Sequence, residues 1–285
     1  MKNNFKGKRL VDKLIVFYAR IFNHPFKFRI LNYIIRKLFR RGVILITPSN
    51  NYFLIKGLDL IQNKILIEDG YELQTLQCID RILHSSNNNN TSKNYLDIGG
   101  NIGLTTFCIS FKNINVYTFE PVYKNFSHLF DNFQINGSPS NITLLNVGFS
   151  DKNEFAKISC PAIGNNGSFA INHTDKLMEH GLFLTTIDSF AEHYNIKDIE
   201  LIKLDVEGYE MIILKGFKQI NTILPKNIIM EFTIQIERTG FTKEKVIKYF
   251  TDLGYDYYDI NGIKHPDLTI LPDDNIWFKL KMSAN

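Results

Sequence analysis

The sequence predicts an α/β fold with a doubly wound, mainly parallel sheet, and three observations support this prediction. From Tyr95 onward, short apolar runs typical of strands alternate with stretches of helical periodicity. The first run is followed by three glycines within five residues and then by a helical stretch. The 285 residues suffice for one large α/β domain with an extension, or for two small domains. Repeated strand–helix units imply parallel strands with helices on both faces.

The N-terminal segment differs from the rest of the chain in charge. Residues 1–41 contain twelve lysines and arginines and one acid, Asp12, which gives a net charge of +11. The remainder of the chain carries −7, so the overall +4 describes neither part. Residues 8–22 and 26–39 both have helical periodicity. One face of the first helix is formed by Leu10, Leu14, Phe17 and Ile21.

Two interpretations of these helices remain open. They pack on the body or on a second subunit of a homodimer, or they form a basic amphipathic anchor on an anionic membrane surface. No apolar run approaches the ~18 residues of a membrane span, and the start lacks a signal peptide. Three widely spaced cysteines indicate a reducing compartment. We therefore expect a cytoplasmic protein with a candidate contact to the inner face of the membrane, and no nucleic-acid partner.

The chain is predicted to have three parts. Residues 1–42 form the basic helical extension, residues 43–93 a small β element with a lead-in helix, and residues 94–285 the main domain. The β element is predicted from the runs Val43–Thr47, Tyr52–Lys56 and Lys64–Ile67, and the lead-in helix from Glu72–Leu83. In the main domain, strands are expected at 95–98, 115–119, 142–147, 154–159, 201–204, 228–232, 255–260 and 276–280, separated mostly by helices.

The glycine turn and an acid after the next strand suit a nucleotide-type cofactor. Ligands of such sheets bind at the carboxyl ends of the strands. Gly99, Gly100 and Gly103 would let the backbone approach a ligand closely, and the following helix would present free N–H groups. Glu120 lies 23 residues after Asp97, an offset at which an acid accepts hydrogen bonds from ribose hydroxyls. Three glycines alone are equally typical of an ordinary turn.

Further acids follow later strands. The pair Ser150-Asp151 ends the third strand, where a short acid can accept a hydrogen bond from a purine amine, although the pair by itself is more typical of an ordinary turn. Asp205 ends a buried strand and Glu207 lies in the turn after it, so both are expected to face the cleft. Lys203 is the expected partner for one of them. Glu231 is a fourth acid on the same edge of the sheet.

These motifs, in this order, resemble the FkbM-type methyltransferases. The resemblance covers about residues 70–235, and its most specific part is the Asp-Val-Glu-Gly block. The motifs that carry it are Asp97-Ile98-Gly99-Gly100-Asn101-Ile102-Gly103, Phe119-Glu120-Pro121, Ser150-Asp151, Lys203-Leu204-Asp205-Val206-Glu207-Gly208-Tyr209-Glu210, Leu214-Lys215-Gly216 and Met230-Glu231.

The resemblance implies an S-adenosylmethionine-dependent O-methyltransferase with the Rossmann-like class I fold and a reversed last strand. It places Glu120 at the cofactor's ribose and Asp151, with Ser150, at the adenine edge. Asp205 and Glu207 would line the reaction cleft. Gly100 departs from the family pattern, which usually has alanine there. The residues expected around the methionine portion are Asp97, Gly99, Asn101 and Gly103.

A hydroxyl acceptor loses its proton as it attacks the methyl group, so a nearby base is required. Glu207 is the first candidate and Asp205 the second, while His173 and His180 are weaker candidates in a possible lid. No spacing of histidine, cysteine and acid residues resembles a metal site. The family is used on glycans and on secondary metabolites, and the basic N-terminus favours a phosphate-bearing or lipid-linked saccharide as acceptor.

Two alternatives belong to other functional classes. A nicotinamide-dependent dehydrogenase would require a full G-x-G-x-x-G turn and a catalytic Tyr/Lys or His group, neither of which the sequence contains. A non-catalytic module that binds only a cofactor or a membrane would show degraded motifs, which this sequence does not. Binding of S-adenosylmethionine or of NAD separates the two enzyme classes.

Overall fold

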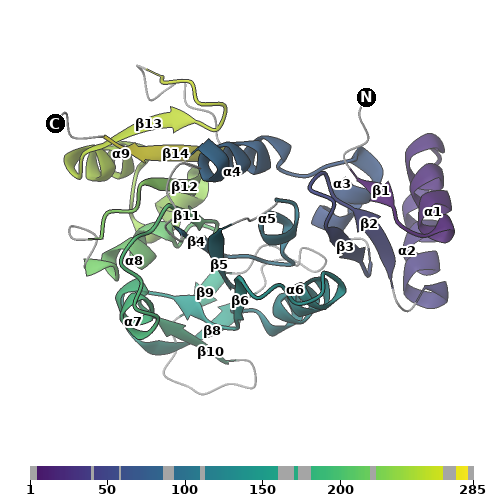
Figure 1. Ribbon diagram of the computed structural model, residues 1–285, viewed down its shortest axis with the longest axis horizontal. Helices are drawn as coiled ribbons and strands as arrows, with labels where there is room; N and C mark the ends of the chain where they lie inside the picture. The colour runs from purple at the N-terminus through teal and green to yellow at the C-terminus, as the bar shows by residue number, and fades with distance from the viewer. Residues whose placement is uncertain are drawn as a thin grey trace.

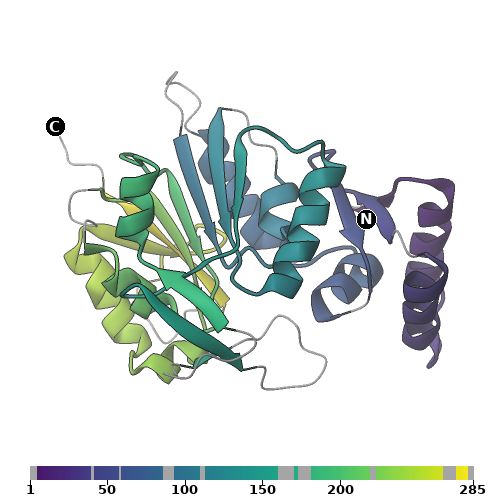
Figure 2. The same ribbon diagram turned by 90° about the horizontal axis from the view of Figure 1, so that it is seen from below.

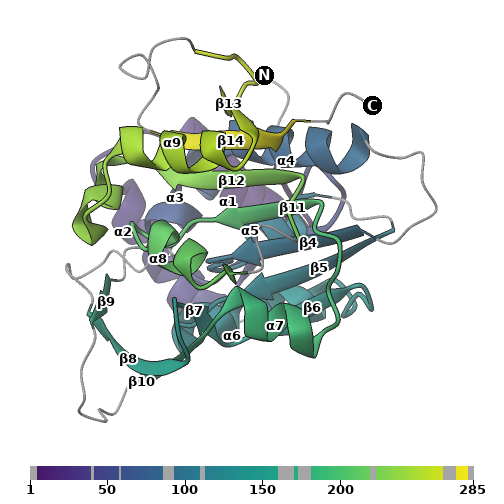
Figure 3. The same cartoon turned by 90° about the vertical axis from the view of Figure 1, so that its left-hand side faces the viewer.

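A seven-stranded sheet forms the centre of the computed structural model (Figures 1 and 3). The structure describes residues 5–39, 42–57, 59–85, 93–109, 113–159, 170–172, 181–218, 223–265 and 274–281. The strand order is β13-β14-β12-β11-β4-β5-β6. The strands are β4 (Lys93–Ile98), β5 (Ile114–Phe119), β6 (Ile142–Leu145), β11 (Leu201–Leu204), β12 (Asn227–Phe232), β13 (Tyr255–Asp259) and β14 (Asp274–Leu280).

Strand directions confirm the predicted doubly wound, mainly parallel sheet. The pairs from β12 through β11, β4 and β5 to β6 are all parallel. β14 runs antiparallel to both of its neighbours, β12 and β13, and is the reversed last strand. The register aligns Lys203 with Asp97 and Asp97 with Thr118, so three polar residues lie in one row across the middle of the sheet.

Helices cover both faces of the sheet, because successive strand residues point to opposite sides. Tyr95 packs in one hydrophobic cluster and its neighbour Leu96 in the other. The first cluster includes residues of α4 (Leu73–Ser85), α5 (Leu104–Phe107) and α6 (Tyr123–Ile135). The second includes residues of α7 (Ile187–His193), α8 (Glu210–Lys215) and α9 (Lys243–Asp252). A 3₁₀ helix, Ile234–Thr239, follows β12.

A four-stranded sheet of order β7-β10-β8-β9 lies beside the domain. The predicted strand at 154–159 is confirmed as β8, and β10 pairs with it in antiparallel orientation. The strands are β7 (Gly148–Phe149), β8 (Glu154–Ser159), β9 (Ala170–Asn172) and β10 (Gly181–Thr185). His173, His180 and Cys160 lie outside the described residues.

The N-terminal unit, residues 5–68 where described, combines a small sheet with helices. Its strands β1 (Lys6–Gly7), β2 (Val43–Ile46) and β3 (Tyr52–Ile55) are antiparallel, so β2 and β3 confirm two of the predicted strands. The third, Lys64–Ile67, was wrongly predicted as a strand. It lies inside α3 (Leu60–Glu68), because the Asp59 side chain accepts a hydrogen bond from the Gln62 backbone N–H and caps a helix there. The helices before β2 are α1 (Leu10–Ile21), α2 (Lys27–Tyr33) and a π-helical turn at Ile34–Leu38.

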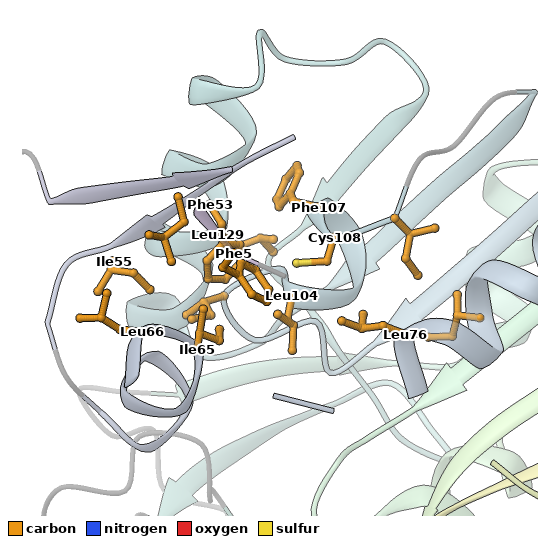
Figure 4. Packing of buried hydrophobic residues seen from close by; sticks show 14 of the residues in the cluster. Phe5, Phe53, Ile55, Ile65, Leu66, Leu76, Leu104, Phe107, Cys108 and Leu129 are labelled. Carbon is orange, nitrogen blue, oxygen red and sulfur yellow. The ribbon is translucent and has the colours of Figure 1, made fainter. Parts of the chain in front are cut away.

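This unit packs firmly on the main domain through β3 and α6. Leu54 N donates to Asn132 Oδ1 at 2.7 Å, and Tyr52 N donates to Asn136 Oδ1 at 2.8 Å. The edge of β3 is therefore satisfied by side chains of α6 instead of by another strand. Below this edge, one continuous hydrophobic cluster joins Phe53 of β3 to Leu129 of α6 (Figure 4).

Helix α1 buries the face opposite to the apolar stripe recognised in the sequence. Ile15, Val16 and Ala19 are buried against the rest of the unit. Helix α1 lies at the end of the molecule opposite to α9 (Figure 2). Its exposed side chains are Leu10, Leu14, Phe17 and Ile21, which are 57–75% exposed. Among the described residues, no helix combines the length and apolar character required to span a bilayer.

Candidate active site

The glycine turn folds over the carboxyl ends of three strands. Gly99, Asn101 and Gly103 adopt positive φ angles of 85°, 49° and 89°. A Cβ atom on Gly99 would lie 1.9 Å from the backbone oxygen of Asp205, so only glycine lets the turn lie against the end of β11. Gly99 N and Gly100 N both donate to Phe119 O, at 3.0 and 2.9 Å. These contacts fix the turn between β5 and β11.

Asp97 supports this turn from below. Its side chain is fully buried, and Oδ2 accepts hydrogen bonds from the hydroxyls of Thr105 at 2.5 Å and Thr106 at 2.9 Å. Its other oxygen, Oδ1, has no hydrogen-bond partner among the described residues. Burial raises the pKa of Asp97, although Lys203 and the two hydroxyls oppose this effect.

Glu120 joins the glycine turn to the end of β5. One carboxylate oxygen accepts a hydrogen bond from Asn101 N at 2.9 Å, and the other accepts one from Val122 N at 2.8 Å. The side chain is 4% exposed, and burial raises its pKa to about 7 even though these donors favour the charged form. Each carboxylate oxygen has a second lone pair, so Glu120 can still accept hydrogen bonds from a ligand.

A cavity of about 350 Å³ lies above this turn. Of the residues predicted for the site, five line it: Gly99, Asn101, Glu120, Asp205 and Glu207. Four do not. Asp97 is buried beneath the turn, Gly103 caps α5, Ser150 is buried beside β7, and Asp151 is exposed. The lining also contains apolar residues that were not predicted for the site, among them Phe119, Val147, Phe149 and Leu182.

The ends of β11 and β12 bring several carboxylates around one cation. Lys203 is 2% exposed, and its Nζ lies 2.6 Å from Asp205 Oδ2. Burial alone lowers the pKa of Lys203, but the nearby carboxylates, Asp205 foremost, raise it above its usual value. Burial and the charge of Asp205 raise the pKa of Glu72 to about 7. Burial and the like charges of Asp205, Glu210 and Glu207 raise that of Glu231 to about 8.

The turn that carries Glu207 is held in a strained conformation. Glu207 has a φ of 59°, which costs a non-glycine residue on the order of 1 kcal/mol. Glu210 Oε1 accepts hydrogen bonds from Val206 N at 3.1 Å and Gly208 N at 3.2 Å, which stabilises the turn. A Cβ atom on Gly208 would lie 2.3 Å from Gln235 O, so this close packing also requires glycine. The result is that Glu207 faces the cavity.

Tyr71 and Glu72 are lining residues that the sequence did not reveal. They lie just before α4, more than 130 residues from Asp205, yet they line the cavity with it. No local motif marks either of them, and only the packing of the chain around the start of α4 places them there. Among the described residues, no group of three or more histidine, cysteine or acidic side chains is arranged to hold a metal ion.

Comparisons with known proteins identify the family. The model of the methyltransferase FkbM domain matches residues 97–257, more than half of the chain. The chain therefore belongs to the FkbM methyltransferase family, which confirms the resemblance inferred from its motifs.

One curated relative, the hexuronic acid methyltransferase AglP of Haloferax volcanii, is 29% identical over 150 residues. The alignment covers 52% of this chain and 59% of that relative. The crystal structure of methyltransferase FkbM from Methylobacillus flagellatus is 15% identical, with a TM-score of 0.41, over 77% of this chain and 52% of its own. The S-adenosylmethionine-dependent O-methyltransferase of Thermotoga maritima is 12% identical, with a TM-score of 0.41, over 86% and 80%.

Proposed function

We propose that this FkbM-family chain is an S-adenosylmethionine-dependent O-methyltransferase whose acceptor is a sugar hydroxyl. The observation that carries the proposal is the cavity that joins the glycine turn, Glu120 and the carboxylates after β11. The acceptor class is supported by the relative named as a hexuronic acid methyltransferase, of which the chain spans 59%.

The residues of the cavity fit the cofactor. Phe119, Val147 and Phe149 offer apolar surface suited to adenine, next to a carboxylate, Glu120, suited to ribose hydroxyls. The turn at Gly99 would admit the methionine portion without a side chain in the way. Asp97 would act from below by holding the turn through Thr105 and Thr106. Ser150 and Asp151 remain the proposed adenine-edge residues, although neither lines the cavity.

When bound, S-adenosylmethionine supplies an electrophilic methyl group, and the protein aligns the acceptor and takes its proton. Glu207 is the proposed base. Asp205 is the less suitable candidate because its carboxylate is engaged by the buried Lys203 at 2.6 Å. In this scheme, Asp205 and Lys203 form a fixed pair beside the reaction centre, and Glu207 receives the acceptor proton.

The first test is calorimetry of the purified chain with S-adenosylmethionine and, separately, with NAD. We expect binding of the first only; binding of NAD alone would favour a dehydrogenase. The second test is methyl transfer to glycan extracts of the source organism, with mass spectrometry to locate the added methyl group. The Glu207→Gln variant should bind the cofactor and lose turnover, and full activity of this variant would overturn the base assignment. If the wild-type chain binds the cofactor but transfers no methyl group, it is a non-catalytic module.

The N-terminal unit supports a finer proposal, that the acceptor is lipid-linked and the enzyme docks on an anionic membrane. The outward stripe of α1 continues into α2 through Phe22, Phe26, Phe28, Ile30 and Tyr33, which are 39–62% exposed. The same segment of the chain also carries exposed basic side chains, as expected for a helix that lies on anionic lipids. They are Lys6, Lys8, Lys13, Arg29, Arg36 and Lys37.

Vesicle co-sedimentation of the full chain tests this docking. Deletion of residues 1–41 is unsuitable, because β1 and the buried face of α1 belong to the fold. The double variant Leu14→Glu/Phe17→Glu should abolish binding to phosphatidylglycerol vesicles. Tyr123→Glu is the matched control, since Tyr123 is 74% exposed on α6. Unchanged vesicle binding of the double variant would overturn the proposal, and a shift from dimer to monomer would assign the stripe to a homodimer instead.

A further inference from the structure

A second cavity, of about 680 Å³, adjoins the one assigned to the cofactor. The two share five lining residues: Tyr71, Glu72, Asp205, Glu207 and Glu231. The residues proposed for proton removal thus stand between the two cavities. If the first cavity holds the cofactor, the second opens onto the same reaction centre from the other side.

The walls of this second cavity come largely from outside the family-matched range. The end of α3 contributes Lys64 and Glu68, and the start of α4 contributes Gln74 and Thr75. All four precede residue 97, where the match begins. The lining also includes Thr233, Asp274 and Asn275, which follow β12 or lie at the start of β14.

The chemistry of these walls is rich in hydrogen-bond acceptors and poor in positive charge. Six carboxylates line the cavity, against Lys64 in the lining and the buried Lys203 that pairs with Asp205. They belong to Glu68, Glu72, Asp205, Glu207, Glu231 and Asp274. Carboxylates accept hydrogen bonds from hydroxyl groups, whereas a negatively charged ligand would be repelled.

Asn275 supplies an independent sign that the cavity receives a ligand. Its side chain is 6% exposed, and Nδ2 donates to the Thr75 hydroxyl at 3.2 Å. Its Oδ1 is buried and has no hydrogen-bond partner among the described residues. An acceptor left unsatisfied in this way is costly unless a donor reaches it, and a ligand hydroxyl is such a donor.

We propose that the second cavity is the acceptor site and that it selects an uncharged sugar ring over one that carries a carboxylate. This inference rests on the proposed methyl transfer and names a substrate class that differs from the acidic sugar in the name of the relative AglP. The chain before the family-matched range then has a role in specificity, because Glu68 of α3 and Glu72 before α4 contribute carboxylates that a sugar carboxylate would meet.

The test uses two probe sugars that differ in one group, p-nitrophenyl β-glucoside and p-nitrophenyl β-glucuronide. Their binding to the full chain with S-adenosylhomocysteine is followed by saturation-transfer NMR. We expect the glucoside to bind and the glucuronide to bind at least roughly tenfold more weakly, as charge repulsion requires. Equal binding, stronger binding of the glucuronide, or no binding of either sugar would overturn the proposal.

A charge-reversal variant sharpens the test. Glu68 is exposed and lies away from the proposed catalytic groups, so Glu68→Lys should leave the fold and cofactor binding unchanged. It should narrow the preference for the glucoside by roughly fivefold or more. Asp252→Lys on α9, outside both cavities, carries the same charge change and should not alter the preference. If the wild-type chain does not bind S-adenosylhomocysteine, the result counts against the proposed function. If it binds this cofactor product but shows no preference for the glucoside, only the present inference is overturned.

Discussion

The β4–β5 side of the cavity and the β11–β12 side both carry buried carboxylates, but they stabilise them differently. On the first side, Glu120 accepts hydrogen bonds from two backbone N–H groups, and Asp97 accepts them from two threonine hydroxyls. On the second side, Asp205 pairs with the buried ammonium of Lys203 at 2.6 Å, and the same charge lowers the pKa of Glu72. Neutral donors thus bind the carboxylates of the first side directly, although Lys203 also favours the charged form of Asp97, whereas the second side contains the Lys203–Asp205 ion pair.

This difference suggests a division of labour. Backbone N–H donors hold a carboxylate in one position. Such a carboxylate suits the binding of a part of the cofactor whose charge does not change during the reaction. Glu72, Glu231 and Glu120 all have pKa values of about 7 to 8 and can change protonation near neutral pH, but of these three only Glu72 and Glu231 line the second cavity. Such groups suit the side on which an acceptor must lose a proton. Four experiments test this comparison.

The largest effect is expected from Lys203→Met. Removal of one partner from a buried ion pair leaves an uncompensated charge, so we expect the free energy of unfolding to fall by about 3–5 kcal/mol. Urea unfolding at pH 7.5 measures this loss. The double variant Lys203→Met/Asp205→Asn should recover much of it, because the charge that lacks a partner is removed. A loss below about 1 kcal/mol in the single variant would contradict charge balance on this side.

The next effect is on cofactor affinity. Glu120→Gln replaces one acceptor oxygen with an N–H donor that faces the backbone N–H of Asn101 or Val122. A hydrogen bond to a charged group contributes about 1.5–3 kcal/mol, so calorimetry should show S-adenosylmethionine binding weakened roughly 10- to 100-fold. Asp151→Asn serves as a companion variant for the adenine contact proposed from the sequence. Unchanged affinity in Glu120→Gln would remove Glu120 from the cofactor site.

A smaller effect is expected at Gly100, where the family pattern usually has alanine. A Cβ atom there would lie 2.2 Å from Cγ2 of Thr118 on β5. Gly100→Ala should therefore cost about 1–3 kcal/mol of stability, as other overpacked cores do. Thr118→Ser removes that methyl group and keeps the hydroxyl that pairs with Thr106 at 2.9 Å. The double variant Gly100→Ala/Thr118→Ser should recover most of the lost stability, as measured by thermal unfolding. If the stability losses of the two single variants simply add, the Thr118 methyl group does not clash with the new Cβ atom.

The smallest effect concerns pH. In the folded chain, the pKa of Glu231 is raised to about 8 from its usual 4.5, so the folded state binds this proton more tightly than the unfolded state. Its contribution to stability is therefore present at low pH and is lost as pH rises through about 8. Between pH 7 and 8.5, wild-type stability should fall by about 1–2 kcal/mol more than that of Glu231→Gln. Parallel curves in thermal unfolding would show that Glu231 titrates normally.

The sequence by itself determined the main sheet and the family. Alternation of buried residues, such as Tyr95 and Leu96, predicts strands buried on both faces, and the glycine turn, Glu120 and the Asp205–Glu207 turn each lie at a strand end. These features are local, so spacing along the chain is enough to find them. The error at Lys64–Ile67 has a local cause too, because a short apolar run fits a strand or a buried helix equally well.

Only the tertiary structure decided which surfaces meet. Helix α1 has apolar residues on two faces, and its pattern does not say that Val16 is buried while Phe17 is exposed. Tyr71 and Glu72 join Asp205 at one cavity because they lie just before α4, where Thr75 accepts a hydrogen bond from Asn275 of β14. Such contacts link residues far apart in the chain, and they depend on shape and on satisfied polar groups that no local motif records.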